Sequence, residues 1–267
     1  LDFVSFFFAV GALLIVHIPQ PAAEPATDDA KPGLWGDIRF GIRFLRERHG
    51  LLGLALFIAL LNLIINSVIA LSTPMILAFS DPATMGVLQS VGSVGMFLGG
   101  VFISAWGGPR YKMGGMYIAA LFSGLGLALA GLRPVAWTVG LGYFLFLFPI
   151  PVVNALIRAI VQLKVPANVQ GRVFSLMVML ARTGVPIGYL LSGPVADRVF
   201  EPAMAPNGAL ASALGPIFGV GAGRGIGVMF AIAGALMLLA TGMMYLLPAL
   251  RNVERDLPDA SPEPAAS

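Results

Sequence analysis

The 267-residue chain has no cysteine and few charged residues. The absence of cysteine excludes disulfides, thiolate catalysis and cysteine-ligated metals. Charged residues make up 11% of the sequence, whereas a soluble domain carries about 25%. Hydrophobic residues make up 58%, and the mean hydropathy is +0.89. Too little polar surface remains to cover a water-soluble globule of this size, so we expect an integral membrane protein.

Residue patterns that carry chemistry are also lacking. His17 and His49 are isolated, with no carboxylate placed to share a metal, and no serine, histidine and acid set has a plausible fold context. The glycine-rich run 219–227 does not fit a dinucleotide-binding motif, because Arg224 falls where the last glycine is needed and no strand precedes it. We expect no catalytic residue, no metal, no cofactor and no enzyme activity.

Long apolar runs are what the sequence does contain. A run of about 18 or more apolar residues predicts a helix that spans the bilayer. The apolar/polar alternation of a membrane β-barrel is missing. We therefore expect an all-α membrane protein, a polytopic helical bundle. Its expected spans are one isolated run, 1–18, and six further stretches: 51–72, 84–106, 113–132, 136–160, 171–195 and 223–248.

The remaining segments predict a linker, an interfacial helix, a long connection and a tail. Residues 19–32 are rich in proline, alanine and acid, which is typical of disorder. Within the linker 19–50, residues 33–49 predict an amphipathic helix in the headgroup region, because apolar and basic residues form separate stripes. The apolar stripe is Trp35, Ile38, Ile42 and Leu45, and the basic stripe is Arg39, Arg43 and Arg46. We expect a long connection at 196–222 and an unstructured cytoplasmic tail at 251–267.

The basic residues predict how the chain is oriented. With residues 19–50 in the cytoplasm, 12 of the 16 Lys and Arg residues fall on cytoplasmic segments. The other side has only Arg133, Arg198 and Arg224. This bias is the one that the positive-inside rule describes. It also accounts for the net charge of +3 without nucleic acid, which we do not expect as a partner.

One helix followed by six is an odd arrangement for a complete protein. It is natural for the second part of a twelve-helix transporter whose halves are joined by a cytoplasmic loop. In that interpretation residues 1–18 form helix 6, residues 51–250 form the six-helix C-terminal half, and the N-terminal half of the same polypeptide is missing.

A resemblance supports this interpretation. The stretch GGVFISAWGGPRYKMGG (99–115) is similar to the signature loop of the major facilitator superfamily, in which a tight turn and paired basic residues join two helix ends. Gly107 and Gly108 match the turn, and Arg110 and Lys112 match the basic positions, so these four are candidates for a cytoplasmic gate loop. The acidic residue of the full motif is missing.

Two further stretches resemble the macrolide-efflux and enterobactin-exporter branch of the superfamily, namely 162–181 (QLKVPANVQGRVFSLMVMLA) and 193–204 (GPVADRVFEPAM). This resemblance implies an alternating-access exporter of a hydrophobic or siderophore-like small molecule in the bacterial inner membrane, coupled to proton antiport. Two alternatives remain open: a membrane scaffold module without transport, and a lipid-handling member of the superfamily.

Polar residues inside apolar runs are the candidates for a substrate cavity. Arg182 lies about ten residues into its run, where a charge costs about 2.5–3.5 kcal/mol and should face the bundle interior or a wet cavity. It could bind an anionic substrate, pair with a carboxylate of the missing half, or serve a purely structural role. The other candidates are Asn62 and Asn66, which share a helix face, Gln89 near the outer end of its helix, and Asn154.

Acidic residues are almost absent from the apolar runs, since Asp197 and Glu201 lie at or beyond a run's end. We therefore expect the proton-coupling carboxylate in the missing half. Two glycine pairs, Gly95/Gly99 and Gly184/Gly188, predict close helix contacts. Pro149, Pro151 and Pro186 predict kinks.

Overall fold

The computed structural model describes residue 11 and residues 34–256. The expected helix 1–18, the linker up to residue 33 and the end of the tail, 257–267, therefore lie outside the described residues, apart from Gly11. The chain divides into two units, Leu1–Arg39 and Phe40–Ser267. Helix α2 (Leu34–Glu47) crosses the boundary, and all later elements belong to the second unit.

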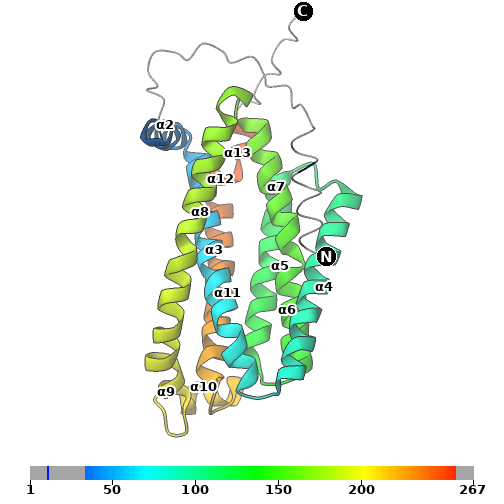
Figure 1. Cartoon of the computed structure of the whole chain (residues 1–267), viewed down its shortest axis with the longest axis vertical. Coiled ribbons are helices and arrows are strands. Elements are labelled where there is room, and N and C mark those ends of the chain that lie inside the picture. The colour runs from blue at the N-terminus through cyan, green and yellow to red at the C-terminus, as the bar shows by residue number, and fades with distance from the viewer. Residues whose placement is uncertain (1–10, 12–33, 257–267) are drawn as a thin grey trace, which may run out of the picture. The chain divides into compact units, whose positions relative to one another are not determined.

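Long helices dominate the second unit, and its described residues contain no strand (Figure 1). Six spans are long and apolar enough to cross a membrane. Five are α3 (His49–Leu77), α4 (Pro82–Trp106), α5 (Lys112–Leu132), α8 (Ala167–Val195) with its extension, and α11 (Arg224–Leu246). The sixth consists of α6 (Ala136–Leu147) and α7 (Pro149–Lys164). The expected all-α, polytopic membrane protein is confirmed, and each of the six apolar stretches is helical.

Glycines bring the antiparallel helices α5 and α11 into backbone contact. A Cβ atom added at Gly227 would lie 2.7 Å from the carbonyl oxygen of Gly131, and one at Gly234 would lie 2.5 Å from that of Gly124. The two glycines on each helix are seven residues apart, which is two helical turns, so both contacts fall on one seam. Close backbone approach of this kind is how membrane helices gain packing without a hydrophobic driving force.

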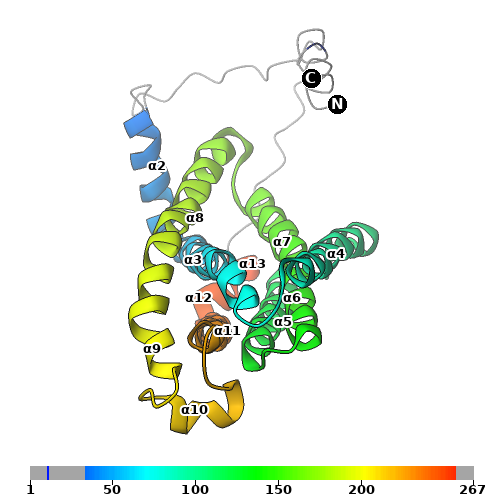
Figure 2. The ribbon, with the colours of Figure 1, turned by 60° about the horizontal axis from the view of Figure 1, so that its bottom comes forward.

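The glycine pairs predicted from the sequence also lie at close contacts. Gly184 and Gly188 bring α8 against α3, where a Cβ at Gly184 would be 2.9 Å from the Ala59 carbonyl oxygen. Gly95 and Gly99 bring α4 against the junction of α6 and α7, where a Cβ at Gly95 would be 2.9 Å from the Phe144 carbonyl oxygen. Figure 2 shows α3, α8 and α11 on one side of this unit, and α4 to α7 on the other.

Prolines interrupt one span and leave another continuous. The helix break at Phe148 lies directly before Pro149, because proline cannot donate the backbone hydrogen bond that would continue α6. Pro186, in contrast, lies inside α8 without ending it. Pro74 also lies inside a helix, near the end of α3, and was not singled out in the sequence.

Two expectations about connections are wrong in part. The segment 196–222 was expected to be a long connection, but α8 continues through a π-helical turn (Ala196–Phe200) into α9 (Glu201–Met204), and α10 (Ala211–Phe218) follows. The region after Pro248 was expected to be unstructured, but α12 (Pro248–Arg251) and α13 (Val253–Asp256) fold onto the bundle. Leu250 and Val253 are buried there, and this burial offsets the polar composition of the segment.

The helix expected at 33–49 is present as α2, and the residues of its expected apolar stripe differ in how far they are buried. Ile42 is exposed, whereas Phe44 and Leu45 are buried in the second unit. A Cβ at Gly41 would lie 2.9 Å from the Leu176 side chain, so the second half of α2 packs on α8. The expected basic stripe stays on the surface, since Arg43 and Arg46 are exposed.

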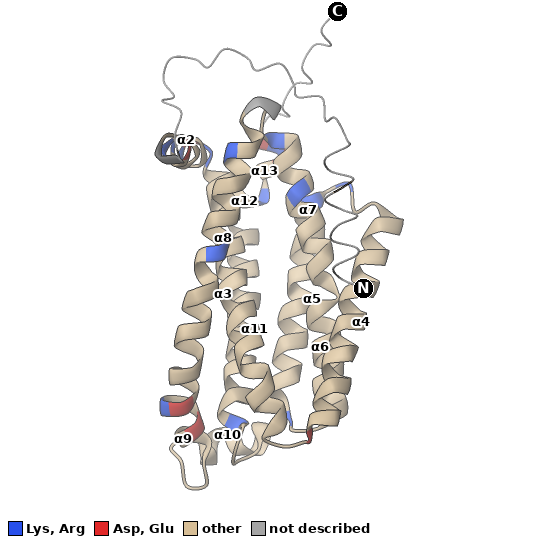
Figure 3. Ribbon diagram, in the orientation of Figure 1, with Lys and Arg blue, Asp and Glu red and all other residues tan. Residues whose placement is uncertain are grey.

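Charged residues gather at the two ends of the bundle (Figure 3). We call one the basic end, because Arg110, Lys112, Lys164, Arg251 and Arg255 lie there. The opposite end carries the turns between α3 and α4 and between α5 and α6, with α9 and α10. The long apolar segments lie between these two ends.

Candidate functional site

The predicted gate loop forms a tight turn at the basic end. Gly107 and Gly108 both have left-handed backbone angles, with φ of 76° and 85°, which a side chain would strain. Gly107 ends α4, and Lys112 begins α5 three residues after Pro109. Arg110 is exposed in the turn and Lys112 is half-buried. The structure therefore places all four candidates on one loop.

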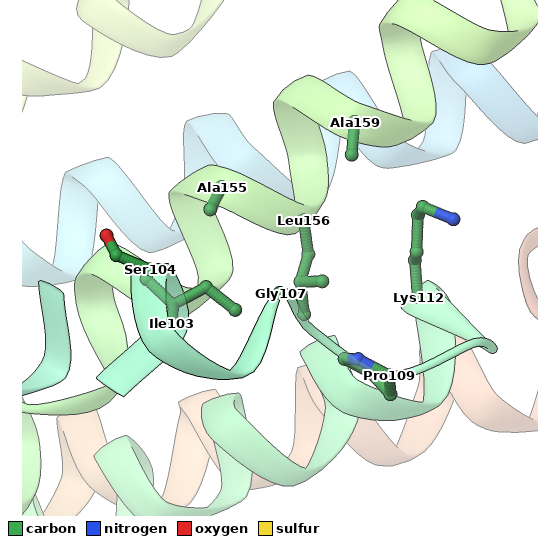
Figure 4. Close-up of a pocket in the computed structure, with 8 residues that line it drawn as sticks. All are labelled: Ile103, Ser104, Gly107, Pro109, Lys112, Ala155, Leu156 and Ala159. Carbon is green, nitrogen blue, oxygen red and sulfur yellow. The ribbon is translucent and has the colours of Figure 1, made fainter. Parts of the chain in front are cut away.

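A small cavity of about 250 Å³ lies beside this loop. Its lining includes Gly107, Pro109 and Lys112 from the loop, and Leu156 and Ala159 from α7. Figure 4 shows that the lining residues come from the end of α4, the loop, the start of α5 and α7. The loop is therefore packed against a third helix and does not stand free.

An acidic residue of α13 contacts the end of this loop, although residues 99–115 lack the acidic residue of the full signature motif. Glu254 of α13 accepts hydrogen bonds from the backbone N–H groups of Lys112 (3.1 Å) and Met113 (2.9 Å). Its carboxylate is also 4.0 Å from the Lys112 ammonium. The unsatisfied N–H groups and positive dipole end of a helix N-terminus favour such a carboxylate. Glu254 therefore caps α5 from 142 residues further along the chain.

Other contacts hold the same segment in place. The Lys164 ammonium of α7 donates to the Glu254 backbone oxygen at 2.6 Å, and the Tyr111 hydroxyl donates to the Arg251 backbone oxygen. Burial raises the pKa of Tyr111, and the charge of Glu254 raises it further, so the hydroxyl keeps its proton at neutral pH. Helices α12 and α13 thus tie the first turn of α5 to the last turn of α7.

At the opposite end of the bundle, a second carboxylate caps the start of α11 in the same way. Glu201 of α9 accepts hydrogen bonds from the backbone N–H groups of Gly223 and Ile226, both at 2.9 Å, where α11 begins. The Arg224 side chain is buried beside it, with its guanidinium 5.6 Å from the Phe79 ring centre. Carboxylates from distant segments therefore cap the starts of both α5 and α11. Neither cap could be predicted from local sequence, because each carboxylate lies more than 20 residues from the helix that it caps.

The cavity candidates lie on the surface of this unit. Asn62 and Asn66 are half-buried on α3, and each side-chain amide donates to the carbonyl oxygen four residues earlier, at 2.9 and 2.7 Å. Buried positions of α3 such as Leu61, Ile64 and Val68 lie on the other side of the helix. The amide oxygens are thus turned away from the core of the unit.

Arg182, Gln89 and Asn154 are exposed. Arg182 lies two residues before Gly184, so the helical register turns it away from the face of α8 that meets α3. Among the described residues, no hydrogen bond or ion pair joins Arg182 to the asparagines. The five candidates therefore do not close one pocket among the residues that the structure describes.

Tyr143 of α6 was not among the candidates. Its side chain is buried, and its hydroxyl has no hydrogen-bond partner in the described part of the chain. A buried hydroxyl without a partner is costly, and such groups are usually satisfied by protein or by ordered water. Sequence reasoning missed it because a tyrosine in an apolar run looks like ordinary core.

Comparisons with known proteins point to one kind of membrane protein. No family model and no solved structure matches the chain. The chain is 24% identical over 208 residues to macrolide efflux protein A of Streptococcus pyogenes, which covers 74% of this chain and 50% of that protein. It is 23% identical over 197 residues to macrolide efflux protein A of Enterococcus faecalis, which covers 70% and 59%. The chain thus spans little more than half the length of these relatives.

The sequence relatives and the fold both indicate a membrane protein of the efflux kind. The relatives are named as efflux proteins, and the described residues include six helices long and apolar enough to cross a bilayer. The resemblance to macrolide-efflux transporters predicted from the sequence is therefore confirmed, and the chain is a multi-pass, all-α membrane protein.

Proposed function

We propose that the chain forms one wall of the pathway by which a membrane transporter exports hydrophobic small molecules of the macrolide kind. The observation that carries the proposal is the match of 208 residues, 74% of the chain, to a macrolide efflux protein. Because the matched part is half of that relative's length, a second six-helix half of the same polypeptide would supply the other wall. Substrate would bind between the halves near mid-membrane.

The polar side chains on the uncovered surface support this arrangement. Asn62 and Asn66 present amide oxygens away from the core, and Arg182 is an exposed cation in a membrane span. Polar groups are costly against lipid, so they favour a surface that meets water, substrate or a partner helix. In this proposal the basic end faces the cytoplasm of a bacterial cell and the protein resides in the plasma membrane.

Proton antiport would require a titratable group near mid-membrane. Within the six described spans, Asp and Glu occur only as Asp197 and Glu201, near the opposite end of the bundle, where Glu201 caps α11. The coupling carboxylate would accordingly belong to the other half. The glycine and basic residues of the gate loop would close the cytoplasmic side, with Glu254 as their acidic partner.

Accumulation of a radiolabelled macrolide tests the proposal. The full-length protein would be expressed in cells that lack their own pumps, with an empty vector as the control. We expect expressing cells to hold less erythromycin, and a protonophore to restore the control level. Equal accumulation with and without the protein would refute macrolide export. Export that a protonophore leaves unchanged would refute proton coupling alone.

A further inference from the structure

A second, larger hollow lies on the side of the unit away from α8. It has a volume of about 580 Å³ and lies between α4, α5 and the α6–α7 junction. This volume falls in the range of about 300–1,000 Å³ that is usual for small-molecule pockets. We call it the aromatic groove, because its wall contains Phe102, Trp106, Tyr111, Phe122, Phe144 and Phe148.

The rings of the aromatic groove form a continuous apolar wall. The ring centre of Phe102 is 5.3 Å from that of Trp106 and 5.8 Å from that of Phe148, and Phe148 is a further 5.8 Å from Phe144. Phe102, Trp106 and Phe122 are all exposed at the rim. Because α4 and α5 are long and apolar enough to span a bilayer, an exposed apolar rim between them suits contact with a hydrocarbon chain.

At the basic end of the bundle, the lining of the aromatic groove changes from apolar side chains to residues of the gate loop. Pro109 and Tyr111 of the gate loop line it there, and Arg110 lies between them in the sequence. Arg110 is exposed, and no described residue pairs with its guanidinium, whereas the neighbouring Lys112 ammonium already faces Glu254. Trp106 and Tyr111 are the residue types that lie at the headgroup level of a membrane. At its basic end the aromatic groove thus lies beside Arg110, a cation that has no acidic partner among the described residues.

We propose that the aromatic groove binds an anionic phospholipid, with one acyl chain along the rings and the headgroup phosphate on Arg110. An arginine matches phosphate oxygens with two parallel N–H donors. Basic sites between membrane helices near the cytoplasmic side are known to hold anionic headgroups. The inference requires only that these helices span a bilayer, so it stands apart from the choice of exported substrate.

Quenching of tryptophan fluorescence by brominated lipids tests the site. The chain has three tryptophans. Trp106 is 52% exposed in the groove, and Trp137 is 72% exposed at the start of α6, at the opposite end of the bundle. Two variants of the full-length protein would keep either Trp106 or Trp137 alone, with every other tryptophan changed to phenylalanine. Each would be reconstituted with brominated phosphatidylglycerol or brominated phosphatidylcholine.

We expect phosphatidylglycerol to reach Trp106 with about fivefold higher relative affinity than phosphatidylcholine, as expected for one basic residue near anionic lipid. Trp137 should show no preference. In the Trp106 variant, Arg110→Gln should remove the preference, while Arg158→Gln, at an exposed arginine of α7 outside the groove lining, should keep it.

Three results would overturn the proposal. They are equal quenching of Trp106 by the two lipids, a preference that survives Arg110→Gln, and an equal preference at Trp137. Relief of quenching at Trp106 by erythromycin, without any headgroup preference, would instead assign the groove to the transported substrate. A lipid preference at Trp106 in a protein that exports no macrolide would leave this inference intact while refuting the proposed function.

Discussion

Helices α5 and α8 are both long and apolar, but the bundle covers them to different extents. In the most apolar part of α5, 56% of the residues are buried, against 28% in α8. Helix α5 is held by glycine contacts to α11 and by the Glu254 cap. Helix α8 meets α3 through one glycine pair and leaves its other face, with Arg182, uncovered. The α5–α11 pair thus stabilises the unit, and α8 offers a surface to its surroundings.

Enlarging a glycine in the α5–α11 seam should have the largest effect. Gly234→Leu would place a Cβ 2.5 Å from the Gly124 carbonyl oxygen and 2.7 Å from the Ala128 nitrogen, both backbone atoms that cannot rotate away. We expect a loss of about 3 kcal/mol or more, at the upper end of overpacking effects. Thermal unfolding of the purified protein measures it.

Gly242→Leu is the matched control, because it lies on the same helix and an added Cβ there meets nothing within 4 Å. This variant should stay within about 0.5 kcal/mol of the native protein. Equal melting temperatures for the two variants would contradict the role of the seam.

Removing either carboxylate cap should have the next largest effect. Glu201→Ala or Glu254→Ala leaves two backbone N–H groups without their charged acceptor. Each should cost about 1–2 kcal/mol in the free energy of unfolding. Glu47→Ala is the control, since this residue is exposed and pairs only loosely with Arg48, at 3.9 Å. If the control costs as much as the caps, helix capping does not explain the stability of these ends.

Changes on the open face of α8 should affect transport more than stability. Arg182→Ala removes an exposed charge, so we expect the free energy of unfolding to change by less than about 0.5 kcal/mol. Export should fall about tenfold, because a charge-assisted hydrogen bond is worth about 1.5–3 kcal/mol. Macrolide accumulation and membrane abundance would be measured together, with Arg158→Ala as the control. Normal export by the Arg182→Ala variant would show that the Arg182 side chain takes no part in transport.

The smallest effect on stability should come from the asparagines of α3. Each amide donates within its own helix, so Asn62→Ala and Asn66→Ala should lower stability by no more than about 0.5 kcal/mol. Their amide oxygens face away from the core, so the change should show in the relative export of different macrolides. An unchanged substrate profile for the double variant would remove both residues from the pathway.

The sequence was sufficient to find the spans but not the contacts between distant segments. The six apolar runs predicted the helices because bilayer thickness sets their length. The turn at Gly107 and Gly108 was found through the resemblance to the signature loop, and glycine suits it because glycine adopts left-handed angles readily. The Glu254 cap could not be predicted, because a carboxylate 142 residues away carries no local signal. The α5–α11 seam was missed because its glycines are seven residues apart, whereas four-residue spacing was sought.

The polar candidates for the substrate cavity show a second limit of prediction from the sequence. Arg182, Asn62 and Asn66 were found as polar residues in two separate apolar runs, but the runs alone did not show that the described residues form no pocket common to them. The continuation of α8 into α9 was hidden by glycine, proline and charge, which the π-helical turn at Ala196–Phe200 accommodates. Composition predicted a loop there because it weighs each residue without its tertiary neighbours.

The most direct test of the proposed wall is the water accessibility of the uncovered surface. The chain has no native cysteine, so single cysteines can be introduced at Arg182, at Asn66 and, as a lipid-facing control, at Leu239, which is 64% exposed on α11. In the full-length protein without other cysteines, a charged methanethiosulfonate should modify Arg182→Cys and Asn66→Cys but not Leu239→Cys, and a macrolide should slow both reactions. No reaction at either site, or rates that the macrolide leaves unchanged, would contradict the account.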